Sequence, residues 1–86
     1  MMYTITVEIE NERGLQAMWS QQGKTLSEMP LRCDFTGALS NCFIEHEFYA
    51  GEYDVHMTVE KGGEYEDSDN CIVKFDGENT TIVEVY

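Results

Sequence analysis

The sequence predicts an all-β fold, a six- to seven-stranded antiparallel Greek-key sandwich, and three observations support this prediction. Apolar and polar residues alternate with a period of two over much of the chain. The alternating runs recur at roughly ten-residue intervals, with turn-forming residues between them. With 42% hydrophobic residues, the 86-residue chain can build one small core, so residues 1–86 are predicted to form a single domain.

The first half of the chain is expected to contain three strands. Residues 3–10 alternate most clearly, with an apolar face that consists of Tyr3, Ile5, Val7 and Ile9. Residues 15–22 fit either a strand or a helical face, and we favour a strand. A polar loop over 23–28 leads to a third strand over 29–35, which should begin at Pro30 or lie at a sheet edge because proline cannot donate a ladder hydrogen bond.

The second half is expected to contain the remaining strands, over residues 42–49, 53–59, 71–75 and 80–86. A loop over 36–41 precedes them, and an acidic connection spans Glu64 to Asn70. Asp76-Gly77 is typical of a hairpin turn. On the strand over 42–49, alternation assigns the core face to Cys42, Ile44, His46 and Phe48.

Several large apolar side chains fall on the faces opposite to this core set: Phe43, Tyr49, Ile72, Ile82 and Tyr86. Some of them must be core residues on strands assigned to the wrong face, because a one-residue slip inverts a strand. Those that are exposed would form an apolar patch with an acidic rim of Glu45, Glu47 and Glu84, and such patches mark protein interfaces.

The segment Phe48-Tyr49-Ala50-Gly51-Glu52-Tyr53 resembles the tyrosine corner of Greek-key sandwiches. In that corner the tyrosine hydroxyl bonds back to the backbone. Together with the strands after it, residues 42–86 resemble the C-terminal half of the carboxypeptidase-regulatory-like or transthyretin-like sandwich family. Immunoglobulin-like sandwiches would show much the same pattern. The resemblance implies a sandwich fold with a binding or structural role, and the family offers no catalytic residues to transfer.

The net charge of −12 is concentrated in residues 44–86, which carry twelve acids and two bases. Such a field repels nucleic acid phosphates and anionic lipid headgroups, so direct binding to nucleic acid or to a membrane is not expected. The predicted partner is a basic protein surface, for example on a nucleic-acid-binding protein, and a homodimer is a further option. The residues predicted to contact the partner are acidic and lie in this half: Glu45, Glu47, Glu52, Asp54, Glu64, Glu66, Asp67 and Asp69.

We therefore predict a non-enzymatic protein-binding domain. Its sharpest form is an inhibitor of the anti-defence or immunity type that mimics the charge of nucleic acid. The alternative is a surface or extracellular structural sandwich module, stabilised by calcium in one version, with ligands from the Glu64–Asn70 segment.

No enzyme, metal or cofactor motif is found in the sequence. Cys42 and His46 would lie too far apart along one strand for a nucleophile–base pair. The histidines and cysteines lack zinc-ligand spacings, so neither a metal site nor a cofactor is expected. The cysteines, Cys33, Cys42 and Cys71, are odd in number and predicted to be buried free thiols, with a Cys33–Cys42 bridge as the alternative. Free thiols and the lack of a signal peptide pattern predict a cytoplasmic protein.

Overall fold

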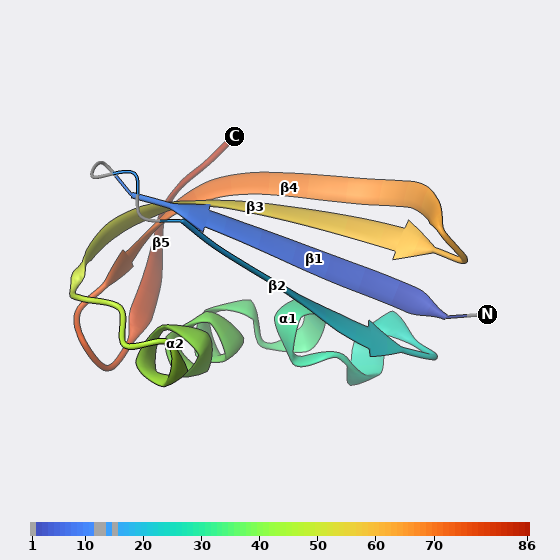
Figure 1. Ribbon diagram of the computed structural model, residues 1–86, viewed down its shortest axis with the longest axis horizontal. Coiled ribbons are helices and arrows are strands. Elements are labelled where there is room, and N and C mark those ends of the chain that lie inside the picture. Colours follow the sequence, from blue (N-terminus) through green and yellow to red (C-terminus); the bar gives the residue numbers. More distant parts are fainter. Residues whose placement is uncertain (1, 12–13, 15) are drawn as a thin grey trace.

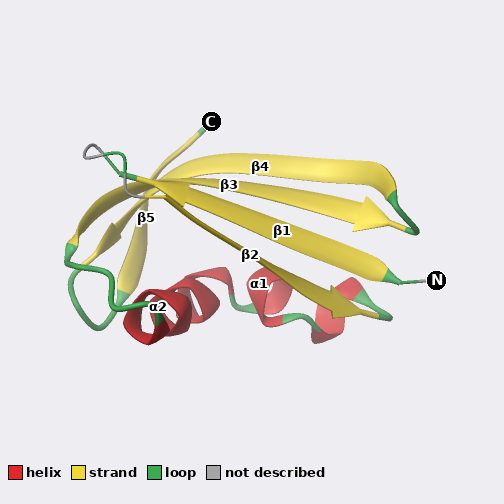
Figure 2. Ribbon diagram, in the orientation of Figure 1, coloured by secondary structure: helices red, strands yellow, loops and turns green. Residues whose placement is uncertain are grey.

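In the computed structural model, which describes residues 2–11, 14 and 16–86, one antiparallel sheet is covered by helices on one of its faces (Figures 1 and 2). The sheet has five strands in the order β2-β1-β3-β4-β5. Along the chain the elements are β1 (Tyr3–Glu10), β2 (Gln16–Gly23), the 3-10 helix η1 (Leu26–Glu28), α1 (Pro30–Cys33), α2 (Phe35–Glu45), β3 (Gly51–Lys61), β4 (Glu64–Phe75) and β5 (Thr80–Val85).

The prediction of a mainly β, antiparallel protein is confirmed, but the predicted strand number and the Greek-key sandwich are wrong. The described residues form five strands and not six or seven, and the layer that faces the sheet is helical. The segments 29–35 and 42–49, predicted as strands, contain α1 and the two ends of α2 with its C-terminal turn. Every fourth residue in this part is apolar, and this spacing places one stripe on a helix: Leu31, Phe35, Leu39 and Phe43.

Local signals at the starts of α1 and α2 explain why this region is helical and does not form strands. Pro30 occupies the first turn of α1, where its missing N–H costs nothing. Asp34 caps α2, because its carboxylate accepts a hydrogen bond of 3.3 Å from the Gly37 backbone N–H. A Cβ atom on residue 37 would lie 2.2 Å from an Asp34 carboxylate oxygen, so a larger residue here would displace the Asp34 side chain from its present position. The loop predicted over 36–41 is therefore the first part of a helix.

An aromatic cluster at one end of the sheet joins α2 to β3 and β4. Phe43 is fully buried, and its ring centroid lies 5.3 Å from Phe48, 5.1 Å from Tyr53 and 4.9 Å from Phe75. The core face predicted for residues 42–49 is wrong at Ile44, which is 54% exposed, and it left out Phe43, which is in the core. Phe48, which was also predicted on the core face, does pack against the core. His46, also predicted in the core, is exposed after α2 and stacks on Trp19.

The faces predicted for the strands over 3–10 and 53–59 are confirmed. Alternate residues of β1 and β3 point toward the helices and are buried: Ile5, Val7, Ile9, Tyr53, Val55, Met57 and Val59. The hydrogen bond expected of the tyrosine corner is also present, since the Tyr53 hydroxyl donates to the Tyr49 backbone carbonyl over 2.6 Å. This bond therefore ties the chain that follows α2 to the first residues of β3.

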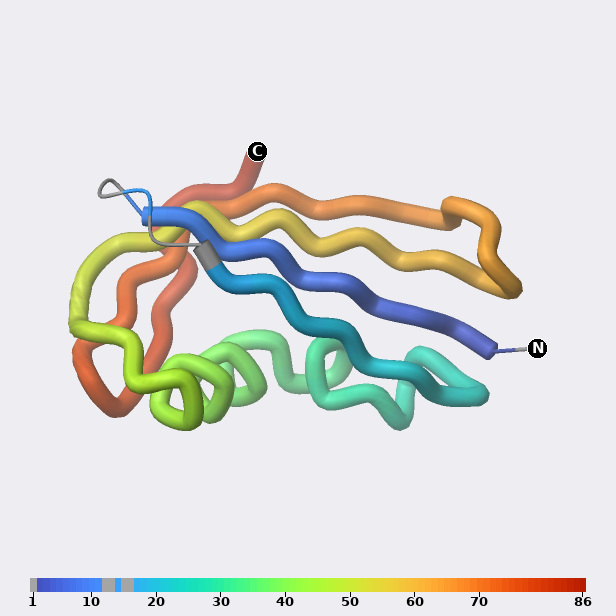
Figure 3. The backbone as a smooth tube through the Cα atoms, in the orientation of Figure 1, coloured from blue at the N-terminus to red at the C-terminus, as the bar shows by residue number. Residues whose placement is uncertain are grey.

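Two register shifts bend the far side of the sheet. Between β3 and β4 the pairing shifts at Val59/Glu60, and between β4 and β5 it shifts at Ile72/Val73. The second shift leaves Val83 as an extra residue on β5, because Ile82 is opposite Val73 and Glu84 is opposite Ile72. Figure 3 shows β4 bending toward α2, with β5 following it as an edge of the sheet.

The turn between β4 and β5 yields a pH-dependent prediction. The Asp76 carboxylate accepts hydrogen bonds from the backbone N–H groups of Asn79 (2.7 Å) and Glu78 (2.9 Å), and these bonds hold the pKa of Asp76 below its usual range. A lowered folded-state pKa stabilises the fold above the unfolded pKa of about 3.9, and the contribution is lost as the pH falls through the folded value. Asp76→Ala should therefore lower the melting temperature at neutral pH and have no effect in strong acid.

Thermal melts of both proteins across the acid range would check this prediction. Glu78→Ala is the matched control, because it removes a carboxylate from the same turn but keeps both backbone donors. A difference between Asp76→Ala and the wild type that stays constant down to the lowest pH would contradict it.

Candidate functional site: the open face of the sheet

One face of the sheet carries no helix and is open to solvent (Figure 2). Alternation directs the even-numbered residues of β1 and β3 to this face, because the odd-numbered ones are buried against the helices. The residues on it are almost all polar, as expected for an antiparallel sheet with one solvated face. The open face is therefore a solvated surface that is available to a partner.

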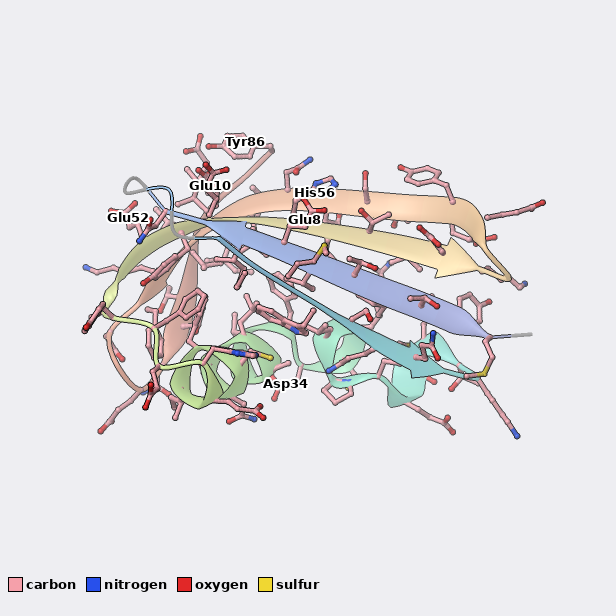
Figure 4. All side chains as sticks on the ribbon, viewed as in Figure 1. Glu8, Glu10, Asp34, Glu52, His56 and Tyr86 are labelled. Carbon is pink, nitrogen blue, oxygen red and sulfur yellow. The ribbon has the colours of Figure 1, made fainter. Side chains whose placement is uncertain are left out.

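Carboxylates gather at one end of this face, and we call Glu8, Glu10, Glu52 and Asp54 the outer acidic cluster. Glu8, Glu10 and Asp54 line a shallow hollow of about 480 Å³, and Glu10, Glu52 and Asp54 line a neighbouring one. Glu10 is directly opposite Asp54 in the β1–β3 register. Figure 4 shows Glu8 and Glu10 on the side of the sheet away from the helices, with Glu52 beyond Glu10 toward the end of the sheet.

The acidic residues continue across the sheet to its β5 edge. The register runs from Glu10 to Asp54, then through Ile72 to Glu84. Loss of hydration and the charges of Glu84 and Asp54 raise the pKa of the Tyr86 phenol, so the negative potential extends to the edge strand.

Few positive charges oppose this row in the part of the chain that is described. Lys74 is opposite Glu52, in the row next to the one that contains Asp54 and Ile72. Among the described residues, the ion pairs shorter than 4 Å all involve Arg32, and none includes a member of the outer acidic cluster. The four carboxylates are thus free to meet a cation from outside.

His56 lies beside the cluster in a small polar network. Its Nδ1 donates to the Asn70 side-chain oxygen, and its Nε2 accepts from the Thr58 hydroxyl over 3.2 Å. A hydroxyl, an imidazole and an orienting oxygen in this order match the parts of a nucleophilic relay. However, Glu8 is opposite His56 in the register, and its charge would oppose the oxyanion that such chemistry generates. The prediction that His56 lies on the polar face is confirmed.

The structure separates the eight residues predicted to contact a partner into four places. Glu52 and Asp54 belong to the outer acidic cluster. Glu45 and Glu47 are exposed at the C-terminal end of α2, where Glu47 has a left-handed φ of 59°. Glu64 and Glu66 are exposed at the hairpin end of β4.

Asp67 and Asp69 lie on the helix side of β4, opposite Val59 and Met57. Their carboxylates are 3.5 and 3.3 Å from the Arg32 guanidinium of α1. They therefore pair with a cation of the chain itself. The acidic connection predicted over 64–70 is a strand, and this strand aims neighbouring carboxylates at different faces.

Glu8 and Glu10 belong to the site but were not among the predicted contact residues. Alternation places both on the polar face of the first strand. Only the pairing of β1 with β3, which joins distant parts of the sequence, brings them next to Asp54. Local sequence signals therefore could not join the two halves of the cluster.

The thiols are not arranged for chemistry at this site. All three cysteines are free, as predicted, but only Cys71 is buried; Cys33 is exposed on α1 and Cys42 is half-buried on α2. Burial, with Asp69 nearby, raises the pKa of the Cys71 thiol, and burial with Glu45 raises that of Cys42. A raised pKa is the opposite of what a cysteine nucleophile needs. Within the described ranges, no three histidine, cysteine or acidic side chains are grouped so that they could hold a metal ion.

Comparison of the chain with protein-family models, with curated proteins and with solved structures finds no match. The resemblance to transthyretin-like sandwiches therefore stays a prediction. In the described part of the chain, no helix has the length and apolar character needed to cross a membrane.

Proposed function

We propose that this chain is a non-enzymatic protein-binding domain whose open sheet face docks on a basic surface of a partner. The observation that carries the proposal is the direct opposition of Glu10 and Asp54 within a cluster of four carboxylates. Like charges directly opposite each other in a sheet destabilise it. A basic partner would relieve this repulsion, so binding would recover free energy that folding alone loses.

The spacing of the cluster supports an inhibitor that mimics nucleic acid charge. Glu8 and Glu10 on β1, and Glu52 and Asp54 on β3, each repeat at every second residue. Such residues lie about 6.7 Å apart along a strand. Two pairs of anions with this spacing on adjacent strands are a charge pattern that a phosphate-binding protein can accept. Electrostatic steering would also speed the encounter with that partner.

The calcium-stabilised module receives no comparable support. Its proposed ligands lie along the extended strand β4, and two of them pair with Arg32. The protein-binding role is therefore the one that we propose.

Neutralisation of the cluster tests this proposal. The variant E8Q/E10Q/E52Q/D54N removes four charges from the open face, and the matched control E45Q/E47Q/E64Q/E66Q removes four charges elsewhere. Both should be measured against a panel of purified basic nucleic-acid-binding proteins, with neutral proteins of similar size for comparison. We expect the cluster variant to weaken binding at least about tenfold, or about 1.4 kcal/mol, and the control to have a much smaller effect.

Salt provides a second readout. Binding through exposed carboxylates should weaken strongly as the ionic strength is raised, because the screening length falls to about 3 Å at 1 M salt. The cluster variant should remain folded, since removal of like charges does not harm the sheet. An equal loss in both variants would show that net charge alone matters, and binding that does not respond to salt would contradict the proposal.

A further inference from the structure

The edge strand β5 has a free side, and its surroundings differ on the two faces of the sheet. Within the described residues, β5 pairs with β4 alone, so its other side presents backbone N–H and C=O groups without a strand neighbour. Its exposed residues include Ile82 (42%), Val83 (54%) and Val85 (66%). Natural edges are protected by charged side chains, proline, a β-bulge or a covering element. β5 has one charge, Glu84, and the bulge at Val83, but neither lysine nor proline, and Ile82 and Val85 remain exposed beside its free side.

On the helix side, an apolar groove runs beside this edge. It has a volume of about 240 Å³, and its apolar lining comes from Leu31, Phe35, Met57, Cys71, Ile82 and Val85. The ion pair of Arg32 with Asp69 lies at its rim. Ser40 of α2 bonds to Thr80 at the start of β5, while Ile82 and Val85 farther along the strand remain partly exposed.

On the open side, the same edge is acidic. Glu84 continues the row that crosses the sheet from Glu10 and Asp54. A sixth strand beside β5 would lie about 4.8 Å away, with side chains alternating between the two faces. One set of its side chains would cover Ile82 and Val85, and the other set would stand next to Glu84.

We propose that β5 accepts an extended segment of the partner protein as a sixth strand, and that apolar residues alternate with lysine or arginine in this segment. The charge complementarity along the open face selects this occupant. A second copy of the chain would bring another Glu84 and a second net charge of −12 to the same edge, whereas a basic segment meets opposite charge there. Strand addition supplies main-chain hydrogen bonds, and the alternate side chains supply specificity. This inference depends on the proposed function, because it names the part of the basic partner that is bound.

The test uses a defined probe: a labelled, capped peptide in which valine or isoleucine alternates with lysine. Fluorescence anisotropy measures its affinity, and amide hydrogen exchange locates it. We expect exchange to slow within residues 80–85, and a peptide with the same side chains but N-methylated along one edge to bind at least about tenfold more weakly. Unchanged exchange in β5 on binding would overturn the inference.

Two variants separate strand addition from general charge attraction. Val85→Lys places a cation on the inner side of the edge, and Ile44→Lys makes the same change on α2, where the side chain is similarly exposed. We expect Val85→Lys to weaken the peptide at least about tenfold and Ile44→Lys by less than about threefold. Glu84→Lys should reverse the preference, so that a peptide with glutamate in place of lysine binds better than the basic one. Equal effects of Val85→Lys and Ile44→Lys would overturn the inference.

Sedimentation equilibrium of the free chain tests the other occupant. We expect a monomer; a dimer that Val85→Lys dissociates would show that a second copy covers β5 and would overturn the inference. Failure of the proposed function has a different signature. In that case E8Q/E10Q/E52Q/D54N would bind basic proteins as well as its control does, whatever Val85→Lys does to the peptide.

Discussion

Phe43→Ala is expected to destabilise the protein by about 3–5 kcal/mol, the range found when a buried aromatic side chain is truncated. Phe43 is fully buried and contacts the rings of Phe48, Tyr53 and Phe75, so its removal leaves a cavity between α2 and the sheet. Because small domains have only about 5–15 kcal/mol of total stability, this single change should leave the fold marginal.

Urea unfolding would measure this loss. The adjacent residue provides a matched control, since Ile44 is 54% exposed and Ile44→Ala should change the stability by no more than about 0.5 kcal/mol. If Phe43→Ala does not fold, Phe43→Leu keeps part of the volume and should show a smaller, measurable loss. Equal stabilities of the alanine variants at residues 43 and 44 would contradict the structure.

Ser40→Ala is expected to cost about 1–3 kcal/mol, although it removes only one oxygen atom. The Ser40 hydroxyl lies 2.9 Å from the Thr36 carbonyl and 2.8 Å from the Thr80 hydroxyl. Because the carbonyl can only accept, Ser40 donates to Thr36, and Thr80 then donates to Ser40. Without the Ser40 oxygen, the Thr80 hydroxyl loses its acceptor and, because it is buried, cannot donate to water instead.

A double-mutant cycle would test this assignment. Ser40→Ala/Thr80→Val removes both hydroxyls and leaves neither group without a partner. Its loss of unfolding free energy should therefore be about 1 kcal/mol smaller than the sum of the two single losses. Thr80→Ser keeps the hydroxyl and serves as the control. Additive losses across the cycle would show that the two groups are not coupled.

Alternation predicted the faces of β1 and β3 correctly because both are regular strands with one solvated face. On β5 it predicted a strand but not its faces, because the extra residue Val83 places Ile82 and Val85 on the same side. It failed for residues 29–35 because one set of residues fits both periods. Leu31, Cys33 and Phe35 alternate as in a strand, but Leu31 and Phe35 are also four residues apart, as on one face of a helix. The helical period appears only when the stripe is followed to Leu39 and Phe43. Gly37, interpreted as a loop residue, lies in the first turn of α2 and donates its backbone N–H to the Asp34 cap.

The candidate site was predictable only in part. Glu52 and Asp54 lie where their alternation placed them, on a solvated strand face. Their association with Glu8 and Glu10 depends on strand order, which is decided by how the helices close over the sheet. The separation of Asp67 and Asp69 from the site depends on Arg32, whose position on α1 could not be foreseen from a predicted strand.

The strand order also determines how this chain must assemble. β3, β4 and β5 follow one another in sequence and in the sheet, and β1 and β2 form a second hairpin. Among the described residues, these two units are joined in the sheet by the pairing of β1 with β3, and the connection from β2 to β3 contains η1, α1 and α2. Closure of so long a loop is slow and entropically costly compared with hairpin formation. We therefore expect the meeting of Val7 with Met57 and of Ile9 with Val55 to limit the folding rate, so that the two halves of the acidic row come together last.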